Sequence, residues 1–172
     1  MAWMVGLARG AIRYWALAGG LVVVALVVMA GASAGSNLLF NRPFLGDFEL
    51  TKHGVAIAAF AFLPYTQLTY GNVTVDIFTE RAGPRARAAM TLLASIIAAC
   101  VALLLARQMW FGMIDYMVYR EVMQSLRLPL WTAFPPALVS LGLLFVASLI
   151  TAGEAIHGLR TGVWSSERTA AG

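Results

Sequence analysis

The feature that most constrains this chain is a set of four long stretches without a charged residue, at 14–41, 54–75, 88–106 and 128–153. A helix that crosses the hydrocarbon core of a bilayer needs about 20 mostly apolar residues. Each stretch meets or approaches that length, and none alternates in the way that barrel strands do. The pattern predicts an all-α integral membrane protein that forms a single domain over 1–172. We expect its four transmembrane helices at about 14–36, 49–69, 87–111 and 131–155.

The composition agrees with a membrane protein. Hydrophobic residues make up 60% of the 172 residues and charged residues 12%, about half the charged share of an ordinary soluble domain. The net charge of +4 comes from basic residues that stand mostly in short segments between the apolar stretches. We interpret them as charges that set the membrane topology and not as a nucleic-acid surface.

The basic residues also predict an orientation. Four crossings would put both termini on one side, together with the 70–87 connection. That side would hold Arg9, Arg13, Arg81, Arg85, Arg87, Arg160 and Arg168, against Arg42, Lys52, Arg107, Arg120 and Arg127 on the other. Because cytoplasmic segments carry an excess of Lys and Arg, this distribution favours cytoplasmic termini.

Two segments admit alternatives. Arg9 and Arg13 before the first apolar stretch, and Ala32-Ser33-Ala34 within it, resemble a secretory signal with a cleavage site. The apolar stretch exceeds the 7–15 residues of a signal core, so we expect it to stay as a membrane span. The connection 107–127 either extends the third helix out of the membrane or forms a short helix on its surface. Its sequence does not decide between the two.

The apolar stretches hold no ionisable residue near their centres, where a proton, ion or substrate path usually has one. The two histidines begin the second span (His53) and end the fourth (His157). About 30 Å of hydrocarbon would separate them, so one haem iron cannot bind both. The chain also lacks a phosphate-binding loop, a nucleophile elbow and metal-ligand spacing. We therefore expect no enzyme activity and no cofactor or metal in this chain.

Candidate structural and partner-binding residues stand near the predicted span ends. Glu49 would favour the positive dipole end of the second helix. Asp76 and Arg81 would anchor the inner connection at the membrane interface. Pro64 and Gly71 would shape the backbone. Each of these residues could instead serve only to set the topology.

A ridge of alanines runs along the third predicted span. Ala94, Ala98, Ala102 and Ala106 are spaced four residues apart. Small residues let membrane helices approach closely, and lipid offers no hydrophobic drive for helices to associate. We expect the ridge to contact another helix, either of this chain or of a partner.

Three segments together carry a resemblance. Residues 64–78 read Pro-Tyr-Thr-Gln-Leu-Thr-Tyr-Gly-Asn-Val-Thr-Val-Asp-Ile-Phe, residues 46–50 give an acidic start to the second span, and a Leu-Pro-Leu-Trp segment with Pro129 and Trp131 precedes the fourth. They resemble the small membrane subunit of the tripartite ATP-independent periplasmic (TRAP) transporters, the DctQ-like small permease. Many members of that family have a His where this chain has Asn72. An Asn side chain can form hydrogen bonds but does not titrate, so any role that depends on protonation of the His is not expected in this chain.

The resemblance implies a four-span, non-catalytic subunit of the bacterial inner membrane. Its partners would be a large permease subunit, which houses the sodium and substrate sites, and a periplasmic substrate-binding protein that delivers an organic acid. The small subunit would brace the large one. Two other functions stay open from the residues alone. One is the membrane anchor of a redox complex, and the other is a homo-oligomeric channel or exporter with a pore lined by Gln67, Ser95 and Ser140.

Overall fold

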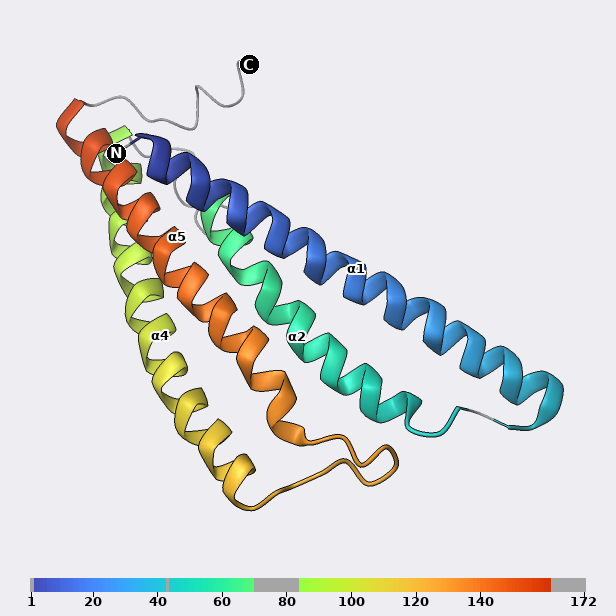
Figure 1. The fold of residues 1–172 in the computed structure, drawn as a ribbon. Coiled ribbons are helices and arrows are strands. Elements are labelled where there is room, and N and C mark those ends of the chain that lie inside the picture. The colour runs from blue at the N-terminus through green and yellow to red at the C-terminus, as the bar shows by residue number, and fades with distance from the viewer. Residues whose placement is uncertain (1, 43, 70–83, 162–172) are drawn as a thin grey trace.

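The computed structural model describes residues 2–42, 44–69 and 84–161, and these are almost entirely helical. Within these ranges the structure has four long helices and one short 3-10 helix (Figure 1). Their bounds are α1 Ala2–Phe40, α2 Asp47–Leu68, α4 Pro84–Val118, η1 Leu130–Ala133 and α5 Phe134–Thr161.

The helices differ from the predicted spans mainly at their ends. The second prediction, 49–69, agrees with α2 within two residues. The first prediction began at residue 14, but α1 begins at Ala2 because Arg9 and Arg13 are good helix formers and do not interrupt it. The third prediction stopped at residue 111, whereas α4 continues to Val118. The connection 107–127 therefore begins as an extension of the third helix.

The fourth predicted span, 131–155, is also displaced. Its first residues form η1, and α5 then runs from Phe134 to Thr161. Pro135 and Pro136 fall in the first turn of α5, where backbone N–H groups have no partner within the helix. Proline is therefore tolerated at these positions and favours a helix start after η1.

By their main contacts the four long helices form a layer in the order α1, α2, α5, α4 (Figure 1), and the first half of α1 also contacts α5 directly. Helix α5 packs against α2 on one side and α4 on the other, while α1 packs chiefly against α2. No Cα atom of α1 lies within 8 Å of one in α4, and the same holds for α2 and α4. The two edge helices therefore do not meet, as they would in a closed four-helix bundle.

Small residues hold α1 and α2 together. A Cβ atom added at Gly19 of α1 would lie 2.7 Å from the Cβ of Ala61, and one at Gly54 of α2 would lie 2.7 Å from a methyl carbon of Leu26. Such distances leave no room for a side chain, so the glycines allow the two backbones to approach. The residues that α2 buries are Gly54, Ala58, Ala61, Pro64 and Gln67.

The other seam joins α4 to α5. Ala102 of α4 packs with Leu141 and Leu144 of α5 in a buried cluster, and Phe60 of α2 lies against it. Buried positions recur along α5 at intervals of three or four residues, which is the spacing of a helix that packs along its whole length. They include Ala137, Ser140, Leu141, Leu144, Ala147, Ser148, Thr151 and Ala155.

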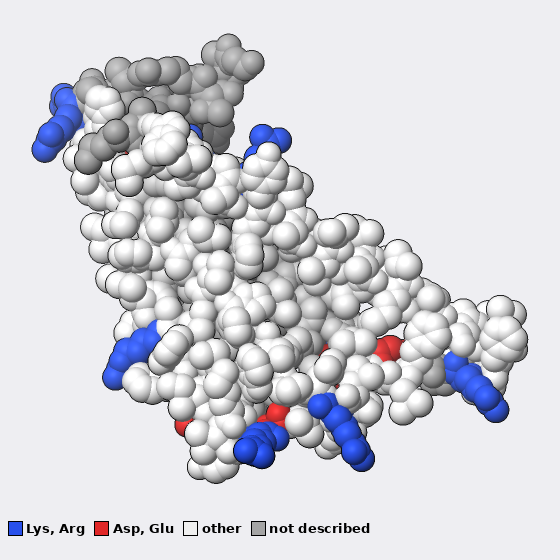
Figure 2. Space-filling model, in the orientation of Figure 1, with Lys and Arg blue, Asp and Glu red and all other residues white. Residues whose placement is uncertain are grey.

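The outer surface has the character expected of a membrane-embedded layer. Lys and Arg side chains gather toward its two ends, and a broad surface without charge lies between them (Figure 2). The uncharged stretch of α1, 14–41, is about 42 Å long as a helix, whereas that of α4, 88–106, is about 28 Å long. A larger tilt of α1 is one way to fit its longer uncharged stretch into the same hydrocarbon thickness. Figure 1 shows the two helices diverging in this way.

Three helical segments are long and apolar enough to cross a membrane, among the described residues: Trp3–Phe40, Arg85–Val118 and Leu130–Arg160. Helix α2 is not among them. It has Asp47, Glu49 and Lys52 in its first turns and Gln67 at its end, which shortens its uncharged part. The count of four crossings therefore stays a prediction.

Candidate functional site

A chain of buried polar side chains crosses the layer and joins three helices. The side-chain amide of Gln67 in α2 donates to the hydroxyl oxygen of Thr151 in α5, at 3.2 Å. The hydroxyl of Ser95 in α4 lies 2.8 Å from the same oxygen. Thr151 in turn donates to the backbone carbonyl of Ser148, at 3.1 Å. One hydroxyl thus uses its proton within α5 and offers its lone pairs to α2 and α4.

These groups are shielded from solvent and satisfied. Thr151, Ser95 and Gln67 are 0%, 1% and 8% exposed. In the described part of the chain no buried side-chain nitrogen or oxygen lacks a hydrogen-bond partner. An interhelical hydrogen bond in a membrane contributes about 0.6 kcal/mol on average. The three residues therefore help to set the register of α2, α5 and α4.

Ser140, the third residue of the hypothetical pore, has a similar environment. Its hydroxyl accepts a hydrogen bond from the indole N–H of Trp15 in α1, at 2.9 Å, and donates to the carbonyl of Pro136, at 2.8 Å. Ser140, Ser95 and Gln67 all lie between helices of one chain. Each is buried within the single chain, and the alternative of a homo-oligomeric pore stays untested.

An ion pair joins α1 to α5 at the end of the layer where α1 begins and α5 ends (Figure 1). The guanidinium of Arg9 donates to the carboxylate of Glu154. Together with the Trp15 contact, this pair holds the first half of α1 against α5, and the backbones of the two helices also approach each other there. Both charges lie beyond the uncharged stretches of their helices.

The opposite end of the layer is held by contacts between the connections. The carboxylate of Glu49 accepts hydrogen bonds from the backbone N–H of Ser125, at 3.1 and 3.2 Å. Gly46 has φ 78°, which favours glycine, and a Cβ there would lie 2.5 Å from Leu126. Glu49 therefore contacts the 119–129 connection of its own chain.

A second set of contacts closes the turn between α1 and α2. The hydroxyl of Ser33 donates to the carboxylate of Asp47, at 2.5 Å, and accepts from the backbone N–H of Phe44, at 3.2 Å. Asp47 stands in the first turn of α2, where a negative charge favours the helix dipole. The contact fixes where α1 ends relative to α2.

The two histidines lie at opposite ends of the layer. His53, near the start of α2, is 3.1 Å from the Thr132 hydroxyl in η1. His157 stands near the far end of α5, and the helix from Phe134 to His157 is about 34 Å long. One haem iron cannot bind both. Within the described residues there is no group of three or more possible His, Cys, Asp or Glu ligands for a metal.

The remaining predicted residues have varied positions. Pro64 is buried inside α2, where it lacks the N–H that would donate to the carbonyl of Phe60. Pro129 immediately precedes η1, and Trp131 is half-buried within it. Gly71, Asn72, Asp76 and Arg81 lie outside the described residues.

The alanine ridge of α4 meets α5 of the same chain around Ala102, and Ala106 packs against the same cluster. Ala102 is 1% exposed and packs in the cluster with Leu141 and Leu144. Ala94 and Ala98 are half-buried, at the border of the seam. The ridge is therefore tilted with respect to the contact, whose buried positions on α4 include Ala88, Ser95, Ala102 and Met113.

Sequence reasoning did not single out Thr151 or the Arg9–Glu154 pair. The signal for Thr151 is the run of small residues on α5, Ala137, Ser140, Ala147, Thr151 and Ala155, at helical spacing. No comparable signal pairs Arg9 with Glu154, since they are 145 residues apart in the chain.

Comparison with known proteins adds the family. Neither the curated proteins nor the solved structures gave a match. The family model described as "Tripartite ATP-independent periplasmic transporters, DctQ component" matches residues 26–158. The matched region runs from the middle of α1 to the last turns of α5, well over half of the chain, and confirms the resemblance. The chain therefore belongs to the DctQ family, the small permease components of the TRAP transporters.

Proposed function

We propose that this chain is a non-catalytic small permease subunit that braces the large permease subunit of a sodium-coupled TRAP transporter. It resides in the bacterial inner membrane, crosses it four times and keeps both termini in the cytoplasm. The large subunit holds the sodium and substrate sites, and a periplasmic binding protein delivers an organic acid to it. The small subunit itself holds no cofactor.

The observation that carries this proposal is the single layer. A layer has two broad faces, and here those faces are mostly apolar, while the buried polar groups are paired between neighbouring helices. Such an arrangement provides a large surface for packing against another membrane protein. A chain that moves ions or acids would instead need a path lined by available polar groups, whereas the buried side-chain polar groups of the described residues are already hydrogen-bonded.

Helix α2 is the fourth crossing in this proposal. Its 22 residues make a helix about 33 Å long, which matches a hydrocarbon core of about 30 Å. It lies between α1 and α5, so its neighbours cover much of the surface that lipid would otherwise contact. A helix shielded in this way needs a smaller apolar surface than the edge helices.

Topology is testable by cysteine labelling. Cys100 is the one cysteine of the chain and lies exposed on α4. In a Cys100→Ala background, a membrane-impermeant maleimide added to intact cells with a permeable outer membrane should label Arg120→Cys. It should label Met4→Cys only after the inner membrane is opened. Labelling of Met4→Cys but not of Arg120→Cys in intact cells would overturn the proposed orientation. Labelling of both in intact cells would put the two residues on the same side of the membrane, which contradicts three crossings between them.

Transport provides the functional test. The chain is purified alone and together with a large TRAP permease subunit from the same genome, and each preparation is reconstituted with the binding protein. Sodium-driven uptake of an organic acid should require both membrane subunits. If the two subunits copurify and the small subunit alone gives no uptake, the result supports a bracing role. Uptake by the small subunit alone, or failure of the two subunits to copurify, would contradict it.

A further inference from the structure

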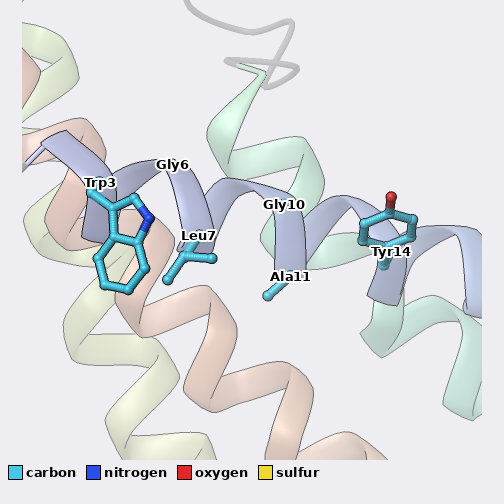
Figure 3. A pocket seen from close by; sticks show the side chains of 6 residues that line it. All are labelled: Trp3, Gly6, Leu7, Gly10, Ala11 and Tyr14. Atoms are coloured by element: carbon cyan, nitrogen blue, oxygen red, sulfur yellow. The ribbon is translucent and has the colours of Figure 1, made fainter.

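The outward face of the first turns of α1 carries an open apolar groove of about 470 Å³. It is lined by Trp3, Gly6, Leu7, Gly10, Ala11 and Tyr14. Figure 3 shows that the side chains of Trp3 and Leu7 extend at one end and that of Tyr14 at the other, with only the Ala11 methyl group between. A Cβ atom added at Gly6 or Gly10 would meet nothing within 4 Å. The glycines therefore form the floor of a groove that none of the described residues fills.

The groove lies at the level of the membrane boundary. Residue 14 begins the uncharged stretch of α1, and Arg9 and Arg13 precede it. Trp3 and Tyr14 are 77% and 74% exposed, and such aromatic rings concentrate where acyl chains meet headgroups. An occupant of the groove would thus have one part in the hydrocarbon and another among the headgroups.

Arg13 supplies a charge beside the groove. It stands three residues after Gly10 and seven after Gly6, which places it on nearly the same side of α1. Arg9 is neutralised by Glu154, whereas exposed Arg13 forms no ion pair with any residue that the structure describes. A guanidinium binds a phosphate through paired hydrogen bonds.

From these features we infer that the groove binds an anionic phospholipid. The acyl chain lies over Gly6 and Gly10 between Trp3 and Tyr14, and the phosphate pairs with Arg13. A second copy of α1 fits less well. Two parallel helices in contact at Gly6 and Gly10 would bring their Arg13 side chains close together, and like charges oppose association.

Lipid titration of the purified full-length protein tests the inference. Native mass spectrometry in a neutral detergent measures the affinity of the first bound dioleoylphosphatidylglycerol and, separately, of dioleoylphosphatidylcholine. Arg13→Gln should weaken binding of the anionic lipid about fivefold, the effect of one basic residue at an anionic surface. It should weaken the zwitterionic lipid less, because the choline cation of that lipid already offsets its phosphate charge. Gly10→Leu fills the groove and should weaken both lipids about tenfold or more.

A matched control exists on the same helix. Gly20 also has open space where a Cβ would be, but it does not line the groove, so Gly20→Leu should bind both lipids like the wild type. Equal wild-type affinity for the two lipids would overturn the inference, as would equal losses in Gly10→Leu and Gly20→Leu. A protein dimer that Gly10→Leu abolishes would assign the groove to a second copy. If Gly10→Leu does not fold, Arg13→Gln decides, and an unchanged preference for the anionic lipid overturns the inference.

Discussion

The middle helix α5 and the edge helix α4 differ in which side chains they bury between helices and which they expose. Helix α5, with a neighbour on each side, buries hydroxyl groups at Ser140, Ser148 and Thr151. Helix α4 has one neighbouring long helix, and its outer side chains Leu93 and Leu104 are 61% and 62% exposed. In a layer surrounded by lipid, large aliphatic side chains therefore mark the outside. Small and hydroxyl-bearing side chains mark the contacts between helices.

The largest effect expected from this comparison is at the α4–α5 seam. Ala102→Leu places three extra carbon atoms into a position that is 1% exposed, and overpacking of this kind destabilises by about 1–3 kcal/mol. Ala89→Leu, on an exposed position of the same helix, should stay within about 0.5 kcal/mol of the wild type. Unfolding in mixed micelles measures both. Equal stability of the two variants would mean that Ala102 does not face α5.

The α1–α2 edge offers a comparison between adjacent glycines. Gly19→Ala brings a Cβ to 2.7 Å from that of Ala61 and should destabilise the protein by about 1–2 kcal/mol. Gly20→Ala meets nothing within 4 Å and should stabilise it by about 0.5–1 kcal/mol through helix propensity. The same unfolding assay applies. A gain of stability at both positions would show that α1 does not approach α2 at Gly19.

The buried polar chain predicts a smaller difference. Ser95→Ala removes a hydroxyl that bonds to another helix, and the loss should be about 0.6 kcal/mol, with about 1.7 kcal/mol as the upper limit. Ser148→Ala removes an equally buried hydroxyl that donates only to Leu144 of its own helix, and should change stability little. A larger loss of stability for Ser148→Ala than for Ser95→Ala would contradict the role of the buried interhelical hydrogen bonds in holding the helices together.

The ion pair between α1 and α5 should give the smallest effect. The side chains of Arg9 and Glu154 are 51% and 28% exposed, and exposed pairs of this kind contribute about 0.2–1 kcal/mol. A double-mutant cycle with Arg9→Gln and Glu154→Gln measures the coupling. The coupling should fall as salt rises from low to high concentration. Coupling that does not change with salt would mean that the pair is more deeply buried than this arrangement allows.

The sequence alone predicted the helices better than their arrangement. Uncharged length is a direct consequence of the bilayer thickness, so it located α2 within two residues of its observed bounds. It could not locate the ends of α1 and α4, because leaving the hydrocarbon does not end a helix. Residues 107–118 continue α4 since they contain no proline and Gly112 alone does not stop a helix.

The site was only partly accessible to sequence reasoning. Gln67 and Ser95 were recognised as polar residues in apolar helices, but their shared partner Thr151 was not. Which helices are neighbours decides whether such residues bond to each other or face a pore, and periodicity does not specify neighbours. For the same reason the alanine ridge predicted a helix contact without indicating that α5 of the same chain would make it at Ala102.

The distance between the edge helices tests the single layer most directly. Spin labels at the native Cys100 of α4 and at Leu21→Cys of α1 both occupy exposed positions, and pulsed electron resonance on dilute protein in lipid nanodiscs measures their separation. Three helix spacings of 8–10 Å place the two axes roughly 24–30 Å apart, to which the label arms add. In a closed bundle the axes of α1 and α4 would be no more than about 14 Å apart. A separation in the longer range supports a layer with two open faces, and one in the shorter range contradicts it.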